Sequence, residues 1–447
     1  MPNPQHVIVL AFENRSFDHM LGFAPPGGML TGQESNPIDP ATPNSERVLV
    51  NQLAPPITGA DPSHSFEGVR EQLFGPSLGQ PDPAPMNGFV SNYIKDVGGD
   101  ITKGKSIMEC YAPESLPVLS GLAKHFCVCT RWFASVPGPT WPNRFYMHAA
   151  TSRGLVTNDP LDGGAMTIYD KLDGKQSWRI YAGDVPQCLS IERLASRFVA
   201  DHLKPQQDRH FQTLAQYFND LQAGALAAYS FIEPQYFDTP FGHASDEHPP
   251  HDVRVGEALL GHVYNALLQS SYWQNSVLLV LFDEHGGFFD SIPPPTGVVA
   301  PDDIVSPQPA FDFTRLGVRV PAVLVSPLVQ PGTVDATQYD HSSIPATVNA
   351  VFGLGANNFL TRRDAAANTF DRNLVAPVAR LLPDVFQADT SSGPPLEALA
   401  PPDATIAGTR KALETVMTQT THSTLASLSS HQRRLIELSD KLLKSLP

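Results

Sequence analysis

Two apolar runs in the sequence are each followed at once by acidic or amide side chains. The run VIVLAF leads into Glu13 and Asn14, and the run VLLVLF leads into Asp283 and Glu284. Continuous apolar runs rich in β-branched residues are typical of strands buried on both faces, as in a parallel sheet. Because ligands bind beyond the carboxyl ends of the strands in open α/β sheets, these four residues are candidates for one common site.

The four side chains have the chemistry of a site for a hard cation. Glu13, Asp283 and Glu284 offer carboxylate oxygens and Asn14 offers an amide oxygen. Adjacent carboxylates repel each other unless a cation or a proton lies between them. We therefore predict one divalent metal ion, Ca²⁺ first, with Mg²⁺, Mn²⁺ and Zn²⁺ as alternatives. Two local interpretations stay open: Asn14 or Ser16 caps a short helix, and the acidic pair forms a solvated turn.

A third string carries a candidate nucleophile. A Pro-Gly-Pro turn precedes Thr140, and Pro142 follows in the first turn of a predicted helix. Thr140 is therefore expected at or near a helix N-terminus, where free N–H groups and the helix dipole favour phosphate. A hydroxyl is a weak nucleophile until a metal or a base activates it, and the carboxylate group would supply that metal. A plain N-cap role for Thr140 is the alternative.

Several histidines lie in polar loops, where a general acid or a phosphate donor would be needed. We predict site roles for His64 and His248. His251 and His285 are further candidates for contact with phosphate. His341 is also considered for a role at the site. For each of them, a surface or core histidine satisfied by its neighbours is the alternative.

The elements that must position these residues alternate between strands and helices. Apolar runs predict strands at 7–12, 277–282 and 320–325, and helical spacing predicts helices at 115–125, 191–202, 211–222 and 255–270. Proline-rich stretches predict long surface loops at 31–63, 74–88 and 290–315. The alternation predicts a doubly wound α/β fold with a mostly parallel sheet flanked by helices.

The chain is predicted to divide into a catalytic domain over 1–385 and a C-terminal part over 386–447. Residues 386–406 carry Ser, Pro and Asp with little periodicity, which is typical of a linker or a long arm. Residues 407–420 and 426–446 have the spacing of two polar amphipathic helices. The simplest interpretation is that they pack on their own domain; a lid, a dimer contact or a lipid-surface contact is the alternative.

Composition narrows the classes of partner. The chain has 447 residues and a formal net charge of −15, so it is not expected to bind nucleic acid non-specifically. We predict no secretory signal and no membrane-spanning run, and we leave contact with a membrane surface and the oligomeric state open. The four cysteines are expected to be reduced core residues. This indicates a cytoplasmic protein, or one exported without a classical signal.

Four strings stand in a fixed order along the chain: ENRSFD at 13–18, PTWPNR at 139–144, HPPHD at 248–252 and DEHGGF at 283–288. Together they resemble the bacterial phospholipase C and acid phosphatase family, which includes the plant non-specific phospholipases C. The resemblance spans about residues 5–355. It implies a core similar to that of alkaline phosphatase.

The resemblance also implies roles for individual residues. It places the metal on the residues that match Glu13, Asn14, Asp283 and Glu284, and the hydroxyl nucleophile on Thr140.

The phosphate-contacting histidines of the family fall on His64 and His248, and Asn143 and Arg144 in the second string are predicted to contact the substrate. The expected activity is metal-dependent hydrolysis of a phosphoric ester. A phospholipase C that releases diacylglycerol through a phosphothreonine is the first prediction, and a broad acid phosphatase is the alternative. A non-catalytic binding protein on the same fold is the third interpretation.

Overall fold

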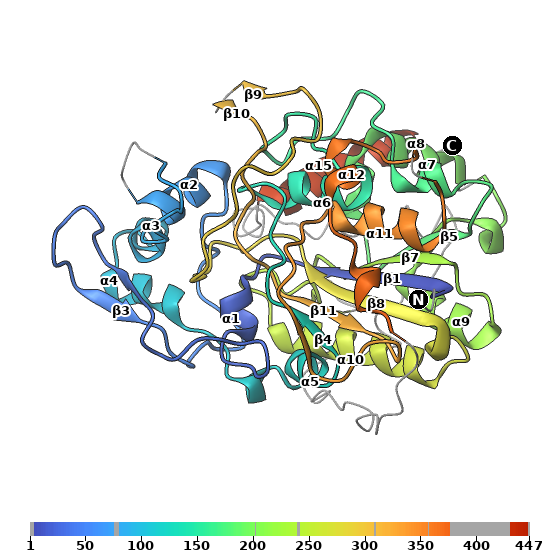
Figure 1. The fold of residues 1–447 in the computed structure, drawn as a ribbon. Coiled ribbons are helices and arrows are strands. Elements are labelled where there is room, and N and C mark those ends of the chain that lie inside the picture. The colour runs from blue at the N-terminus through green and yellow to red at the C-terminus, as the bar shows by residue number, and fades with distance from the viewer. Residues whose placement is uncertain are drawn as a thin grey trace.

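An eight-stranded sheet forms the centre of the protein in the computed structural model (Figure 1), which describes residues 4–75, 80–201, 203–238, 242–307, 310–355, 357–375 and 430–445. The strand order is β12-β4-β11-β8-β1-β7-β5-β6. In that order the strands are Thr333–Asp335, Cys127–Cys129, Ala322–Val325, Ser276–Phe282, His6–Phe12, Tyr229–Glu233, Trp178–Ala182 and Phe211–Thr213. All neighbouring pairs are parallel except those that β11 makes with β8 and β4. The predicted mostly parallel sheet is confirmed.

Helices cover both faces of this sheet. In Figure 1, α6 (Thr140–Ala149) and α11 (Ser343–Val351) lie above the sheet, and α5 (Pro117–His125) and α10 (Val253–Gln269) lie below it. The other described α-helices are α1 (Phe17–Leu21), α2 (Phe66–Phe74), α3 (Phe89–Asp96), α4 (Ile101–Gly104), α7 (Ile168–Leu172), α8 (Glu192–Asp201), α9 (Leu214–Ala223), α12 (Arg362–Ala366) and α15 (Ser430–Ser445). The predicted doubly wound α/β architecture is therefore confirmed.

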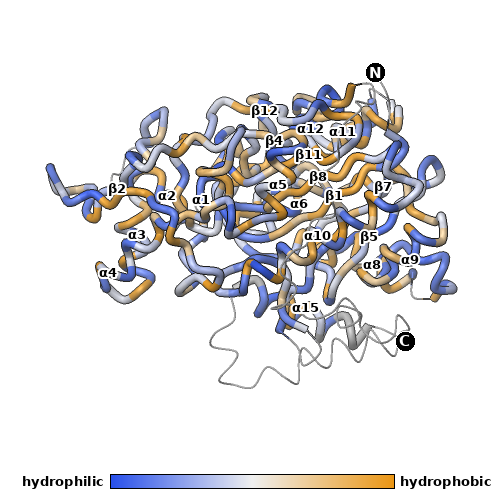
Figure 2. The backbone as a smooth tube through the Cα atoms, turned by 90° about the horizontal axis from the view of Figure 1, so that it is seen from below, coloured by the Kyte–Doolittle hydropathy of each residue, from blue (hydrophilic) through white to orange (hydrophobic). Residues whose placement is uncertain are grey.

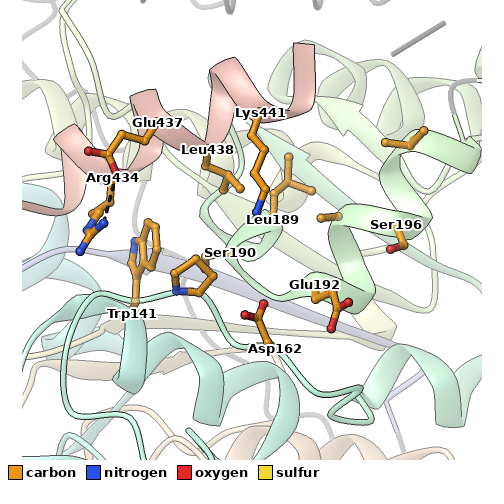
Figure 3. A pocket seen from close by; sticks show the side chains of 13 residues that line it. Trp141, Asp162, Leu189, Ser190, Glu192, Ser196, Arg434, Glu437, Leu438 and Lys441 are labelled. Carbon is orange, nitrogen blue, oxygen red and sulfur yellow. Dashed lines mark hydrogen bonds and ion pairs between the residues drawn. The ribbon is translucent and has the colours of Figure 1, made fainter. Parts of the chain in front are cut away.

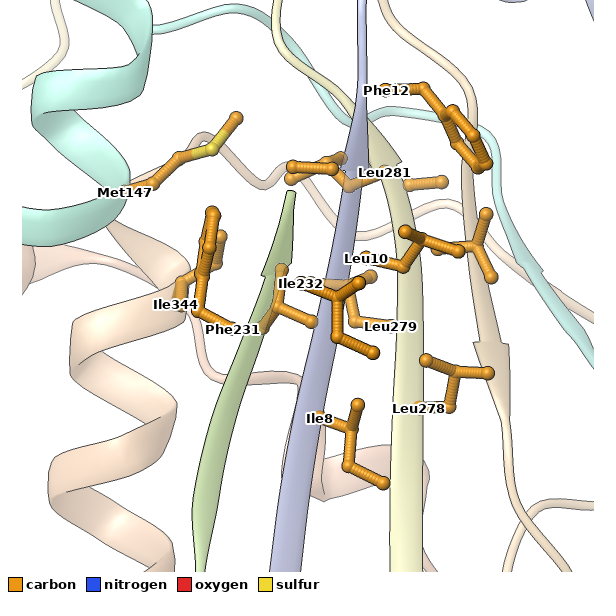
Figure 4. Close-up of a cluster of buried hydrophobic side chains, with 14 of the residues drawn as sticks. Ile8, Leu10, Phe12, Met147, Phe231, Ile232, Leu278, Leu279, Leu281 and Ile344 are labelled. Atoms are coloured by element: carbon orange, nitrogen blue, oxygen red, sulfur yellow. The ribbon is translucent and has the colours of Figure 1, made fainter. Parts of the chain in front are cut away.

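The strand β1 lies in the middle of the sheet because its side chains are apolar on both faces, and a central strand buries both faces. Residues 7–12 are fully buried, and the strand pairs with β8 on one side and β7 on the other. Figure 4 shows Met147 of α6 and Ile344 of α11 packed toward Phe231 of β7. Burying one Val, Leu, Ile, Phe or Met side chain contributes about 1.5–3 kcal/mol, so this layer holds the strand ends rigidly.

Some predicted boundaries are corrected by the structure. The predicted helix over 211–222 is wrong at its start, because residues 211–213 form β6 and α9 begins at Leu214. The Thr213 hydroxyl accepts a hydrogen bond from the Gln216 N–H and so ends the strand and caps the helix. Sequence periodicity also missed β7 and β5, which are too short for their period to stand out.

The predicted loops carry short hairpins. Within 31–63 the chain forms β2 (Ser35–Pro37) and β3 (Arg47–Leu49), and within 290–315 it forms β9 (Ser306–Pro307) and β10 (Ala310–Phe311). With α2, α3 and α4, the first hairpin makes the lobe at the left of Figure 1. Its own apolar cluster includes Phe288 of the segment that follows β8, so the lobe is tied to the edge of the sheet that carries the candidate site.

The described part of the C-terminal region packs on the body of the protein. In α15, Leu435 is fully buried and the Gln432 side-chain amide donates to the Tyr236 carbonyl at 2.8 Å. The predicted linker over 386–406 and the predicted helix over 407–420 lie outside the described residues.

Apolar residues gather in the central strands and polar ones in the outer loops (Figure 2). The four cysteines are buried and form no disulfide, as predicted. Within the described parts of the chain, no helix has the length and apolar character to cross a membrane.

Candidate active site

The carboxyl ends of the parallel strands β1, β8 and β7 meet at one edge of the sheet. Glu13 and Asn14 follow β1, Asp283 and Glu284 follow β8, and Glu233 ends β7. All five side chains are fully buried. The interpretation of the Asp283-Glu284 pair as a solvated turn is therefore wrong.

Thr140, Asn14 and Asp283 are joined by hydrogen bonds although they lie far apart in the sequence. The Thr140 hydroxyl donates to Asn14 Oδ1 at 3.3 Å, and the Asn14 N–H donates to Asp283 Oδ1 at 3.1 Å. Thr140 is the first residue of α6, as predicted, but the N-cap is Pro139. The hydroxyl is therefore not a helix cap, and it faces the end of β1. Ser16 takes the capping role at α1, where its hydroxyl accepts from the His19 N–H.

Paired glycines allow the ends of β1 and β8 to approach each other. Gly286 has a φ of 63°, and a Cβ on it would lie 2.0 Å from the Asn14 carbonyl oxygen. Gly287 has a φ of 76°, and its Cβ would lie 2.8 Å from the Ser63 carbonyl oxygen. Both positions need glycine for conformation and for space. They bring Asn14 and the segment that carries His64 against the same turn.

Arg144 lies against two of the predicted metal ligands. Its Nε donates to Asp283 Oδ2 at 2.9 Å, and its Nη2 lies 3.4 Å from Glu13 Oε1. The same Nη2 donates to the Phe12 carbonyl at 3.2 Å. The guanidinium thus holds the ends of β1 and β8 together and neutralises part of the buried charge.

The buried carboxylates of Glu13, Asp283 and Glu284 carry more negative charge than Arg144 can neutralise. Burial raises the pKa of Asp283 well above its usual value; Arg144 opposes the shift, and Glu13 and Glu284 add to it. A bound cation relieves this cost, and the oxygen donors are those that a divalent metal accepts. The donor types of this edge therefore suit a metal ion, although the Glu13, Asp283 and Glu284 oxygens do not all lie within 4.8 Å of one another.

His64 lies between two carboxylates. Its Nδ1 is 2.7 Å from Glu284 Oε1, and its Nε2 is 3.6 Å from Asp61 Oδ2. Burial opposes the charged imidazolium, but Glu284 and Asp61 outweigh burial and raise the pKa of His64 well above its usual value. Burial likewise opposes ionisation of Glu284, yet the His64 charge lowers the pKa of that carboxyl to about 2.

Asp61 is a site residue that sequence reasoning missed. Among the described residues, one cluster of three or more His, Cys, Asp or Glu side chains has ligand atoms that lie within 4.8 Å of one another. This cluster consists of Asp61, His64 and His248. Glu284, a predicted metal ligand, instead pairs with His64. The signal for Asp61 was its place three residues before His64 in the same polar loop.

The remaining predicted histidines are each held by a neighbour. His251 Nδ1 lies 2.6 Å from Asp246 Oδ1, and His285 Nε2 donates to the Gln72 side-chain oxygen at 2.8 Å. His341 Nε2 donates to the Asp283 carbonyl at 2.6 Å, and its Nδ1 accepts from an indole N–H. His341 therefore supports the backbone of Asp283, and burial lowers its pKa to about 4.

Asn143 is used by the turn before α6. Its side-chain oxygen accepts from the Val136 N–H at 2.9 Å, and its Nδ2 donates to the carbonyls of Val136, Gly138 and Pro139 at 3.0–3.1 Å. The predicted contact between Asn143 and the substrate stays a prediction. These hydrogen bonds fix the turn that precedes Thr140.

A cavity of about 660 Å³ adjoins α6 at Trp141 (Figure 3). It lies between α15, α8 and Trp141, the residue that follows Thr140. Leu189 and Leu438 supply apolar walls, and Glu192, Arg434 and Lys441 supply charge. The C-terminal helix thus completes a cavity next to the helix that carries the candidate nucleophile.

Comparison with known proteins gives the family and the relatives of this chain. Residues 4–355 match the model of the Phosphoesterase family. The chain is 42% identical over 386 residues to non-specific phospholipase C1 of Arabidopsis thaliana, covering 82% of this chain and 70% of that protein. It is 26% identical over 432 residues to phospholipase C B of Mycobacterium tuberculosis, covering 83% and 78%.

A solved structure from the alkaline phosphatase superfamily of Vibrio parahaemolyticus is 14% identical with a TM-score of 0.35, covering 58% of this chain and 65% of that one. The family match spans both strand ends, the turn before α6 and the histidine loops. The chain therefore belongs to the Phosphoesterase family and is an enzyme that hydrolyses phosphoesters.

Proposed function

We propose that the chain is a phospholipase C that cleaves phospholipids on the glycerol side of the phosphate. The observation that carries the proposal is the Thr140 hydroxyl, which lies 3.3 Å from Asn14 Oδ1 at the start of α6. Similarity to a plant non-specific phospholipase C over 82% of the chain supports the lipid substrate. The products are diacylglycerol and a phosphorylated head group.

Thr140 is the proposed nucleophile. Its Oγ attacks phosphorus, the bond from phosphorus to the glycerol oxygen breaks, and a phosphothreonine forms. The positive end of the α6 dipole favours the phosphate oxygens beside it. Asn14 accepts the hydrogen bond of the hydroxyl and so orients it. Water then attacks phosphorus, releases the phosphorylated head group and restores the hydroxyl.

Glu13, Asn14, Asp283 and Glu284 are the proposed ligands of one divalent metal ion. A metal bound there would lower the pKa of the hydroxyl and offset the charge of the phosphate. Arg144 holds Asp283 in place through its Nε bond. The ends of β1 and β8 are thereby kept in one arrangement before substrate binds.

His248 or His64 is proposed to protonate the leaving glycerol oxygen, which completes the release of diacylglycerol. His64 lies beside Glu284, and His248 Nε2 lies 4.0 Å from Asp61 Oδ2 in the loop that also carries His64. His251 and His285 are proposed to contact the substrate phosphate, with their rings held in place by Asp246 and Gln72. Contact of Arg144 with the substrate phosphate is proposed only as a secondary role, since its Nε is engaged by Asp283.

Two substrates test the proposal in one experiment. The purified protein is incubated with phosphatidylcholine vesicles and, separately, with p-nitrophenyl phosphate, each with Ca²⁺, Mg²⁺, Mn²⁺ or Zn²⁺. Release of diacylglycerol at a kcat/KM above that for p-nitrophenyl phosphate is expected. Turnover of p-nitrophenyl phosphate without diacylglycerol would instead establish a broad acid phosphatase and contradict the lipid assignment.

A further inference from the structure

We propose that the cavity between α6, α8 and α15 binds one fatty-acyl chain of a glycerolipid, with the ester carbonyl of the chain on the Trp141 indole N–H. The cavity has a volume of about 660 Å³, which is within the usual range of small-molecule sites. Binding of the chain rests on the geometry of this cavity. Its use during turnover rests on the proposed function.

The indole N–H of Trp141 is a buried donor that the described residues leave without an acceptor. Trp141 lines the cavity and is 1% exposed. Its backbone N–H donates to Asn158 Oδ1 at 2.9 Å, whereas its Nε1 has no hydrogen-bond partner in the described part of the chain. Figure 3 shows the ring directed from the start of α6 toward α15. Because a buried donor without an acceptor is costly, a ligand oxygen in the cavity would stabilise this side chain.

The floor of the cavity is largely apolar. Leu189 is buried there, and Ala195, Val199 and Leu438 are half-buried. Ser190 is also buried, but its hydroxyl already donates to a backbone carbonyl at 2.6 Å. An apolar floor gains free energy when it removes an aliphatic chain from water. Together with the indole N–H, this floor suits an aliphatic chain that carries a carbonyl oxygen.

The rim of the cavity carries charges of both signs. Three acidic and two basic side chains line it, and all of them are exposed: Asp162, Glu192, Glu437, Arg434 and Lys441. Arg434 Nη1 lies 3.2 Å from Glu437 Oε2, so part of this charge is already paired. The acidic side chains are in slight excess, which disfavours a free fatty-acid anion. A neutral glycerol ester therefore complements the cavity better than a fatty acid.

Two walls of the cavity are shared with the catalytic edge. Trp141 directly follows Thr140 at the start of α6. The 3₁₀-helix η3 (Gln187–Ser190) supplies part of the floor, and the Gln187 side-chain amide donates to Glu13 Oε1. A phospholipid held at Thr140 has to place its glycerol chains on an apolar surface nearby. This cavity supplies such a surface beside the proposed nucleophile.

Binding of a monoacylglycerol series to the full-length protein tests the proposal. Hexanoyl, octanoyl and decanoyl glycerol are titrated below their critical micelle concentrations by isothermal titration calorimetry. Each methylene buried in the cavity is expected to tighten Kd by about fourfold. Ala195→Phe fills the cavity from α8 and is expected to abolish binding. Ala200→Phe is the matched control, because that alanine is exposed on the same helix and does not line the cavity.

Ester and ether ligands of one chain length test the contact with Trp141. An alkyl glycerol ether lacks the carbonyl oxygen and is expected to bind the wild type about threefold to tenfold more weakly than the ester. In Trp141→Phe the N–H is absent, so the two ligands are expected to bind equally. Melting curves by circular dichroism verify that each variant is folded. Equal binding of ester and ether to the wild type would overturn the assignment of the carbonyl to Trp141.

A free fatty acid distinguishes the other occupant of the cavity. Decanoate that binds more tightly than decanoyl glycerol, and loses this advantage in Lys441→Gln, would overturn the glycerolipid assignment. Unchanged binding of decanoyl glycerol in folded Ala195→Phe would overturn the site itself. Failure of the proposed function has a different signature: the wild type would release no diacylglycerol with any metal, while decanoyl glycerol would still bind and Ala195→Phe would still prevent it.

Discussion

The Thr140 hydroxyl, the proposed nucleophile, does not cap α6. Pro139 is the N-cap of α6, and the hydrogen bond of the hydroxyl goes to Asn14 at the end of another element. Thr140 is also fully buried, at the edge where Asp283 and Glu13 lie. A metal ion bound at the proposed site would activate this hydroxyl as a nucleophile.

Replacing Thr140 tests this role directly. Thr140→Ala is expected to reduce kcat by roughly 10³-fold or more, because the covalent step is lost. Thr140→Ser keeps the hydroxyl and is expected to remain active. Hydrolysis of phosphatidylcholine is measured by diacylglycerol release, and mass spectrometry of acid-quenched wild type is used to find the phosphorylated peptide. Near-normal kcat in a folded Thr140→Ala protein would contradict the nucleophile assignment.

Removal of metal is expected to destabilise the protein as well as stop turnover. The carboxylates of Glu13 and Asp283 are buried, and without a cation their repulsion is offset mainly by Arg144. A ligand at 100 times its Kd stabilises the native state by about 2.7 kcal/mol.

Thermal melts with and without a chelator measure this effect. The melting temperature is expected to fall by several degrees in the wild type and to recover when the metal is restored. Asp283→Asn should show a smaller difference between the two conditions. An equal melting temperature with and without the chelator in the wild type would count against a structural contribution of the metal.

At the scale of elements, one turn and one helix start hold neighbouring elements together. The turn after β8 meets the end of β1 through Gly286, and α10 supports α5 through Glu257. The Glu257 carboxylate accepts from the N–H groups of Val118 and Leu119 at 2.6 and 3.0 Å. The Gly286 contact joins two strand ends at the site, and the Glu257 contacts join two helices within the layer below the sheet.

Gly286→Ala separates steric contact from backbone strain when compared with Gly297→Ala. Both glycines have positive φ, 63° and 70°, but only a Cβ at Gly286 meets Asn14, at 2.0 Å. The Gly297 change is expected to cost about 1–2 kcal/mol, the strain of a left-handed residue. The Gly286 change is expected to cost at least roughly twice that and to abolish turnover, because β1 and β8 must separate.

Urea unfolding and diacylglycerol release measure the two effects for both variants. Equal stabilities and equal activities for Gly286→Ala and Gly297→Ala would show that the approach of Asn14 to this turn is not needed.

Glu257 makes stability depend on pH. Burial raises the pKa of Glu257 to about 7, with the Val118 and Leu119 N–H groups opposing the shift. Because the folded pKa exceeds the ordinary value near 4.5, this contribution is present below about pH 4.5 and is lost as pH rises through about 7. The loss is on the order of 3 kcal/mol. Glu257→Gln should therefore show a flatter stability profile between pH 5 and 8 by urea unfolding, and an unchanged slope would contradict the shift.

At the scale of the whole molecule, the described C-terminal helix belongs to the catalytic body by its contacts. Leu435 is fully buried in the main core, and α15 lines the cavity beside Trp141. The sequence predicts a domain boundary between residues 385 and 386, and that boundary stays a prediction. The packing of α15 shows that this helix contacts the body of the protein although it lies far from the rest of the body in sequence.

Leu435→Ala measures how strongly α15 is coupled to the body. Truncation of a buried leucine costs about 2–5 kcal/mol, so the melting transition of the whole enzyme is expected to shift downward. Leu53→Ala, at a position that is 72% exposed, is the control and is expected to change stability little. A normal melting transition in Leu435→Ala would indicate that α15 unfolds independently of the body.

The sequence by itself determined the buried strands, the order of the motifs and the position of Thr140. These features are local: a long apolar run favours burial, and a Pro-Gly-Pro turn followed by Thr140 and Pro142 favours a helix start. The predicted ligands Glu13, Asn14 and Asp283 could therefore be placed at strand ends, and parallel strands bring such ends to one edge.

Only the tertiary structure decided which side chains face one another at that edge. Arg144 reaches Asp283 across 139 positions of sequence, and Asp61 joins His64 and His248 through a loop from another lobe. Such contacts depend on strand order and on the close approach at Gly286, and neither is encoded in local periodicity. The sequence thus set the chemistry available at the strand ends, and the packing of distant elements set its partners.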